Sequence, residues 1–154
     1  MVGKMDLDYS YLLLKYSLIR AMLVLIYNLT SEKTMIYKND LINIKVEKSE
    51  IPWLIIFTNE NIKEFSQCDN KTKTEIFRCL DIIEKHMLEY YTPEKINIAS
   101  FGNYVPHVHF HIMARFKEDS YFPEPMWGKK QREANLSLPS FDEFTKRLLN
   151  KLNS

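Results

Sequence analysis

The chain has 154 residues, of which 45% are hydrophobic and 27% charged, and its formal net charge at pH 7 is +1. This length suits one domain that buries roughly two-thirds of its unfolded surface, and the composition excludes a wholly disordered chain. A nearly neutral chain has no global electrostatic reason to bind nucleic acid or an anionic membrane surface. We therefore expect one domain, with neither nucleic acid nor membrane as a partner.

Cysteine is rare, with Cys68 and Cys79 as the two examples. Two isolated thiols are too few for a disulfide framework or for a cysteine-based zinc site. This usage is typical of a reducing compartment, and we expect a cytoplasmic location.

Residues 1–33 form an N-terminal extension that contains an apolar stretch, Tyr11–Leu29, and the remaining residues, 34–154, form the body of the chain. Lys15 and Arg20 interrupt the apolar stretch, and its longest unbroken run, Ala21–Tyr27, is too short to span a bilayer. We predict that the extension is helical and packs in the fold or against a partner. A targeting element or a start-site extension stays open as the alternative.

Three short β-rich segments follow the extension, at Thr34–Tyr37, Leu41–Val46 and Trp53–Thr58. Turn-forming residues separate them, at Lys38–Asp40 and at Ser49–Pro52. Such short connections predict that the three strands are antiparallel neighbours.

A long helix is predicted next, because Thr72-Lys73-Thr74-Glu75 reads as a capping box. Thr92-Pro93 should stop this helix after Tyr91. The apolar residues that follow the capping box recur at helical spacing: Ile76, Leu80, Ile83 and Met87.

The remaining elements alternate between strands and irregular structure. Lys95–Ser100 is a strand candidate, and after a turn at Gly102-Asn103 a second strand runs to Arg115. Asp119–Gly128, rich in proline and aromatic residues, predicts an ordered loop, and a capping box at Ser140–Glu143 begins a C-terminal helix. Short strands around one long helix predict an α+β domain.

Three of the four histidines occupy alternate positions in Pro106–Ile112. In an extended strand His107, His109 and His111 would project from one face, and the apolar residues between them from the other. Imidazole can act as nucleophile, proton carrier or metal ligand near neutral pH. This strand therefore predicts a functional site.

Two chemistries fit such a histidine face. In the first, a neutral imidazole attacks phosphorus, and the neighbouring histidines orient it and donate to the phosphoryl oxygens. In the second, histidines at i and i+2 share a zinc ion. Successive side chains on one strand face lie about 6.6 Å apart, so three of them reach one ion poorly.

The residues around the histidines resemble those of the histidine triad (HIT) family, in which histidine alternates with hydrophobic residues. The resemblance centres on Gly102–Ile112 and covers roughly Thr34–Glu133. Other segments that resemble a bacterial subgroup of this family are Pro52–Ile55, Lys95–Ala99, Ala114–Phe116 and Phe122–Gly128.

The resemblance implies a HIT-like antiparallel sheet of about five strands with one long central helix and a C-terminal helix, to which this chain adds an N-terminal helix. It also implies a homodimer that binds a purine nucleotide and hydrolyses or transfers it at the α-phosphate through a nucleotidyl-histidine intermediate. The implied substrates are nucleoside phosphoramidates or dinucleoside polyphosphates. No metal and no obligatory cofactor are implied.

The family's catalytic residues map onto the three histidines. By this resemblance His109 is the nucleophile, His111 contacts the phosphate and His107 supports the nucleophile. Five further residues are candidates for substrate binding, with Glu47 in the place of a ribose-binding carboxylate: Asn97, Asn103, Glu47, Arg115 and Trp127.

Two positions depart from the family's pattern. Asn61 stands where many members carry another histidine, and Tyr104 stands where a small hydroxyl residue is common. Both changes remove groups that assist turnover. The alternatives are therefore a catalytically weak nucleotide-binding module of the same fold and a zinc protein with histidine ligands.

Overall fold

The computed structural model describes residues 15–19, 22 and 34–154. The chain divides into two units, residues 1–34 and 35–154, each of which is described by itself. Most of the predicted helical extension lies outside the described residues. Within its described part, Lys15–Ile19 are helical. Within the described part of the chain, no helix combines the length and the apolar character needed to cross a bilayer.

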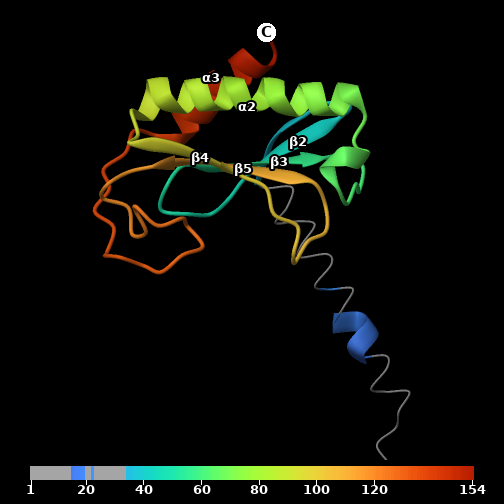
Figure 1. The fold of residues 1–154 in the computed structure, drawn as a ribbon, viewed down its shortest axis with the longest axis horizontal. Coiled ribbons are helices and arrows are strands. Elements are labelled where there is room, and N and C mark those ends of the chain that lie inside the picture. Colours follow the sequence, from blue (N-terminus) through green and yellow to red (C-terminus); the bar gives the residue numbers. More distant parts are fainter. Residues whose placement is uncertain (1–14, 20–21, 23–33) are drawn as a thin grey trace, which may run out of the picture. The chain divides into compact units, whose positions relative to one another are not determined.

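The second unit is built on one antiparallel sheet of five strands in the order β1-β2-β3-β5-β4 (Figure 1). This arrangement confirms the predicted α+β class and the number of strands. Their bounds are Met35–Lys38 for β1, Ile42–Val46 for β2, Trp53–Thr58 for β3, Lys95–Ala99 for β4 and His109–Arg115 for β5.

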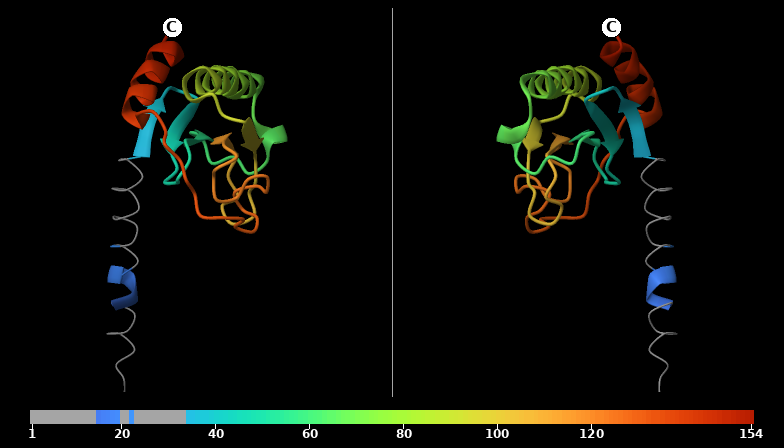
Figure 2. Two further views of the ribbon diagram at one scale, coloured as in Figure 1. Left: turned by 90° about the vertical axis from the view of Figure 1, so that its left-hand side faces the viewer. Right: turned by 90° about the vertical axis from the view of Figure 1, so that its right-hand side faces the viewer.

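The long helix α2, Asn70–Tyr91, covers one face of the sheet (Figures 1 and 2). The helix begins about one turn before the predicted capping box at Thr72–Glu75. The predicted start of the helix is therefore wrong. Asp69 is the N-cap, because its carboxylate accepts the backbone N–H of Thr72 at 2.7 Å. The helix ends at Tyr91 as predicted, followed by Thr92 in a left-handed conformation.

The predicted C-terminal helix is confirmed as α3, Phe141–Leu152, and its N-cap Ser140 accepts the backbone N–H of Glu143. Phe144, Leu148 and Leu152 are its buried residues. One single-turn 3-10 helix, η1, spans Phe65–Gln67 before α2.

The two faces of the sheet differ in chemistry. Residues paired directly across antiparallel strands project to the same side. Phe57 pairs with His109 and Ile55 with His111, which places both histidines on the face opposite α2. The intervening residues of these strands pack beneath α2 and form the core, with Leu54, Ile56, Ile112 and Ala114 each at most 1% exposed.

The histidine strand is shorter than predicted. β5 begins at His109, and His107 lies in a bend before it, so only two of the three histidines belong to the strand. The reason is local hydrogen bonding, because the backbone N–H of His107 donates to Val105 O at 2.8 Å instead of joining the sheet. A loop on the face opposite α2 therefore carries His107.

Candidate functional site

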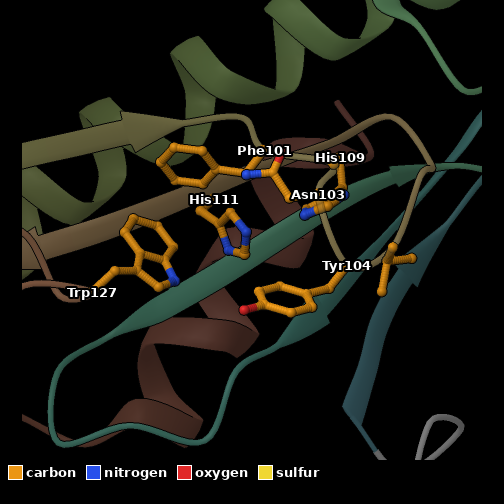
Figure 3. A pocket seen from close by; sticks show the side chains of 8 residues that line it. Phe101, Asn103, Tyr104, His109, His111 and Trp127 are labelled. Carbon is orange, nitrogen blue, oxygen red and sulfur yellow. The ribbon is translucent and has the colours of Figure 1, made fainter.

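A cavity of about 340 Å³ opens beside β5, on the face of the sheet opposite α2 (Figure 3). The loop between β4 and β5 supplies most of its wall. The cavity brings together four of the predicted site residues, His109, His111, Asn103 and Trp127. The complete lining is Phe101, Gly102, Asn103, Tyr104, Val105, His109, His111 and Trp127.

His109 lines this cavity with its ring held by a hydrogen bond to the backbone. Its Nδ1 lies 2.7 Å from the backbone oxygen of His107, and a carbonyl oxygen can only accept, so Nδ1 carries the proton. In the neutral ring, Nε2 then holds the lone pair. The ring stacks on Phe57 with a centroid distance of 5.1 Å and is 8% exposed, which restricts its rotation.

His107 supports His109 through its backbone rather than its ring. Its Nε2 lies 2.9 Å from both Oγ1 and the backbone oxygen of Thr58. Thr58 Oγ1 donates its own hydrogen to Glu60 O at 2.8 Å, so both oxygens of Thr58 accept from His107 Nε2–H. The His107 ring therefore ties the loop to the end of β3, and the His107 carbonyl orients the His109 ring.

His111 is a neutral ring beside His109. Its centroid lies 4.9 Å from that of His109, with the two rings nearly perpendicular. The indole Nε1–H of Trp53 donates to its Nδ1 at 3.1 Å. Burial, with a further contribution from His109, lowers the pKa of His111 to about 4. At neutral pH this ring therefore carries no charge.

The mouth of the cavity is aromatic. Trp127 makes edge-on contacts with Trp53, His111 and Phe101 at centroid distances of 5.3, 5.1 and 4.7 Å. Trp127 and Phe101 are about half exposed, and the side chain of Tyr104 is fully exposed. A flat aromatic group entering from solvent would therefore meet ring edges on several sides.

Arg115 and Asn97 lie together, but neither lines this cavity. Arg115 is 1% exposed and binds both carboxylate oxygens of Asp119 at 2.8 and 3.0 Å. It also donates to Asn97 Oδ1 at 2.9 Å and to the backbone oxygen of Glu124 at 2.8 Å. The guanidinium is thus used to anchor the loop that carries Trp127.

Two more positions lie away from the histidines. Glu47 is exposed and lines a different cavity of about 250 Å³ together with Tyr91 and Phe141. Asn61 is exposed in the loop that follows β3. Among the described residues, no group of three or more histidine, cysteine or acidic side chains is arranged to hold a metal ion.

The residues missing from the sequence prediction come mainly from β3. Trp53 contacts His111, Phe57 contacts His107 and His109, and Thr58 contacts His107. Alternation along Trp53–Thr58 could have divided this strand into two faces, but the pairing with β5 was needed to show which face meets the histidines.

Comparison with known proteins agrees with this architecture. The HIT domain family matches residues 28–118, which is more than half of the chain. A histidine triad protein from Bradyrhizobium japonicum is 26% identical with a TM-score of 0.63, and the match covers 79% of this chain and 92% of that one. A histidine triad protein from Sinorhizobium meliloti is 25% identical with a TM-score of 0.61, covering 77% and 90%.

A third structure, a histidine triad protein from Marinobacter aquaeolei, is 22% identical with a TM-score of 0.63 over 80% of this chain and 94% of that one, and it shows the shared fold. No curated protein sequence matches the chain. The extent of the family match, together with the five-stranded sheet and its histidines, establishes that the chain belongs to the HIT domain family.

Proposed function

We propose that this protein is a nucleotidyl hydrolase or transferase in which His109 Nε2 attacks the α-phosphorus of a bound nucleotide. HIT-family members are typically nucleotide hydrolases or transferases. The observation that carries the proposal is the hydrogen bond from His109 Nδ1 to His107 O, since it leaves Nε2 unprotonated beside the cavity.

The reaction proceeds in two displacements. The lone pair of His109 Nε2 forms a bond to phosphorus, and the bond from phosphorus to the leaving group breaks, with its electron pair going to the leaving group, which takes a proton from solvent. The positive charge on the nucleotidyl-imidazole is stabilised by the Nδ1–H bond to the His107 carbonyl. Water, or another acceptor, then attacks phosphorus, and the bond from phosphorus to Nε2 breaks with its electron pair returning to the ring. The attacking group releases its proton to solvent, and the ring is neutral again.

The charge of the cavity favours an uncharged leaving group. Among the described residues that line it, none is a lysine or an arginine. In the following loop Arg132 donates to three backbone oxygens, Lys130 pairs with Glu133, and Lys129 is exposed outside the cavity lining. A polyphosphate leaving group would therefore enter an apolar site without a compensating cation.

A purine nucleoside phosphoramidate with an aromatic amine is consequently the preferred substrate, and a dinucleoside polyphosphate is the second candidate. We expect kcat/KM to be at least about 10-fold higher for the phosphoramidate, which corresponds to about 1.4 kcal/mol of transition-state stabilisation. A higher kcat/KM for the dinucleoside polyphosphate would reverse this preference.

The decisive experiment is to trap the intermediate. The full chain is mixed with a slowly hydrolysed nucleoside phosphoramidate, quenched at alkaline pH and digested for mass spectrometry. We expect an acid-labile nucleotidyl group on His109. The control variant is His86→Gln, because His86 is buried between α2 and α3 and bonds to Phe144 O at 3.1 Å. Absence of an adduct, with turnover unchanged in His109→Asn, would overturn the proposal.

Exposure of Tyr104 favours one alternative. Its fully exposed side chain places no hydroxyl against the histidines, so support for a leaving group is weaker than a short hydroxyl residue would give. Nucleotide binding without turnover or adduct across all substrates would identify a binding module. Stoichiometric zinc that is removable only with loss of folding would instead identify a zinc protein.

We also propose a cytoplasmic homodimer. The two free cysteines are both buried, which suits a reducing compartment. β4 lies at the edge of the sheet, and Ile98 on β4 and Leu88 on α2 are both more than 40% exposed. Edge-to-edge pairing of two β4 strands would cover them. Sedimentation equilibrium should show a dimer for the wild type and a monomer for Ile98→Lys. A monomeric wild type would exclude the homodimer.

A further inference from the structure

Trp53 makes a hydrogen bond that its position in the strand does not require. It is the first residue of β3 and is 9% exposed, so burial alone would account for a tryptophan there. Its indole Nε1–H nevertheless lies 3.1 Å from Nδ1 of His111, and the two rings meet edge-on at 5.5 Å. A phenylalanine would give the same burial without this bond.

The indole nitrogen can only donate a hydrogen bond. Nδ1 of His111 must therefore present its lone pair to Trp53, and the proton of the neutral ring must lie on Nε2. The opposite holds for His109, whose Nδ1 donates to the His107 carbonyl. The two adjacent rings are thus held in opposite tautomers, with an acceptor Nε2 on His109 and a donor Nε2 on His111.

We propose that Trp53 is a positioning residue that fixes the tautomer of His111, so that a neutral imidazole presents Nε2–H to a non-bridging phosphoryl oxygen of the nucleotide. This inference rests on the proposed function. The two nitrogens then have complementary tasks, since His109 Nε2 supplies an electron pair to phosphorus and His111 Nε2–H stabilises the charge on oxygen. With Nδ1 protonated instead, the lone pair of His111 Nε2 would repel that oxygen.

Trp127 provides the matched control. It also contacts the His111 ring, edge-on at 5.1 Å, but in the part of the chain that the structure describes it forms only ring contacts there. It is 47% exposed on the loop after β5, whereas Trp53 is buried within the sheet. Comparing Trp53→Phe with Trp127→Phe therefore separates loss of the N–H donor from loss of an aromatic neighbour.

The test is nuclear magnetic resonance of the ¹⁵N-labelled full chain, in which long-range ¹H–¹⁵N correlations report the proton on each histidine nitrogen. We expect a single Nε2–H tautomer for His111 in wild type and Trp127→Phe. In Trp53→Phe we expect a mixture of tautomers, with a higher pKa for His111 because a bond to its neutral form is lost. With the phosphoramidate, kcat should fall about 10-fold in Trp53→Phe with little change in KM.

A wild-type measurement keeps the inference testable if Trp53→Phe folds poorly. The Trp53 indole proton should exchange slowly with water until His111 is protonated, because protonation removes its acceptor. An Nδ1–H tautomer in wild type, or an unchanged tautomer in folded Trp53→Phe, would overturn the inference. These readouts need no turnover, so a chain inactive toward every nucleotide would refute the proposed function without deciding the tautomer.

Discussion

The two ends of β5 each carry a basic side chain, and the two side chains differ in how many of their polar atoms are bonded to protein. At the first residue, His109 uses one ring nitrogen to bond the backbone and keeps the other beside a cavity. At the last residue, the Arg115 guanidinium donates hydrogen bonds to Asp119, Asn97 and the backbone of the next loop. Both side chains are more than 90% buried, so exposure does not separate them.

The difference lies in what remains unbound. A side chain whose polar atoms are all satisfied by protein stabilises the fold, and binding a ligand would first require breaking those bonds. A side chain with one atom bound and one atom facing a cavity is oriented for chemistry. We therefore assign the His109 end to reaction and the Arg115 end to stability, and the predictions below test this division.

The largest expected effect is on turnover in His109→Asn. The asparagine amide can still donate to the His107 carbonyl, but Nε2, the nucleophile that we propose, is lost. We expect kcat to fall on the order of 10³-fold or more, with a small change in the free energy of unfolding. Steady-state kinetics and urea denaturation measure the two quantities. Retained turnover would contradict the role of the His109 end.

Asp119→Asn should affect stability instead. It leaves the buried Arg115 guanidinium without its counter-charge, which typically costs about 3–5 kcal/mol of unfolding free energy. The matched control is Glu133→Gln, which breaks the exposed pair with Lys130 and should cost less than about 1 kcal/mol. The folded fraction of Asp119→Asn should still form the adduct on His109. Equal losses in the two variants would argue against a stabilising role.

Lowering the pH should reduce the free energy of unfolding through groups at both ends of β5, but in different pH ranges. Burial lowers the pKa of His111 to about 4 in the fold from about 6.5 for an exposed histidine, so between these values the unfolded chain binds a proton that the folded chain does not. Unfolding free energy should therefore fall as the pH drops from 6.5 to 4, on the order of 1–2 kcal/mol after allowing for the partly exposed ring. Burial lowers the pKa of His86 and adds to this loss.

The stability contributed by Asp119, at the Arg115 end, should be lost only below this pH range. Burial raises the pKa of Asp119, but hydrogen bonds from Arg115 and the backbone outweigh it and bring the pKa below 3.8. Its contribution is present above 3.8 and is lost as the pH falls through the lowered pKa. Urea denaturation against pH should show a shallower loss between 6.5 and 4 in His111→Asn. An unchanged slope in that variant would exclude His111 as its source.

The smallest effect is expected at the hydroxyl of Thr58. Thr58→Val removes one acceptor of His107 Nε2–H and the donor to Glu60 O, and should cost about 1 kcal/mol of unfolding free energy. A few-fold loss of kcat should accompany it, because the His107 carbonyl loses part of its anchoring. Thr58→Ser keeps the hydroxyl and should behave like wild type in both assays. If Thr58→Val and Thr58→Ser gave the same unfolding free energy and kcat, the Thr58 hydroxyl would have no role in the site.

Much of the fold could be predicted because its signals are local. A β-rich run bounded by turn-forming residues located β3, helical spacing and Pro93 located the end of α2, and Ser140 located the start of α3. The start of α2 was missed because two polar residues, Asp69 and Thr72, both suit an N-cap, and only the bond between them shows which one acts. The site was recognised from Gly102–Ile112, whose spacing is specific.

The sequence by itself determined the α+β class, the membership of His109 and His111 in one strand face, and the resemblance to the HIT family, because each depends on residues close together in the chain. Only the tertiary structure decided which atoms of those rings are free. The protons of His109 and His111 are placed by His107 O and by Trp53 Nε1, and Trp53 is 58 residues distant from its partner. The tautomer of His109 depends on the bend before β5, which brings His107 O to the ring two residues further on, and the tautomer of His111 depends on a contact across strands that exists only once β3 and β5 have paired.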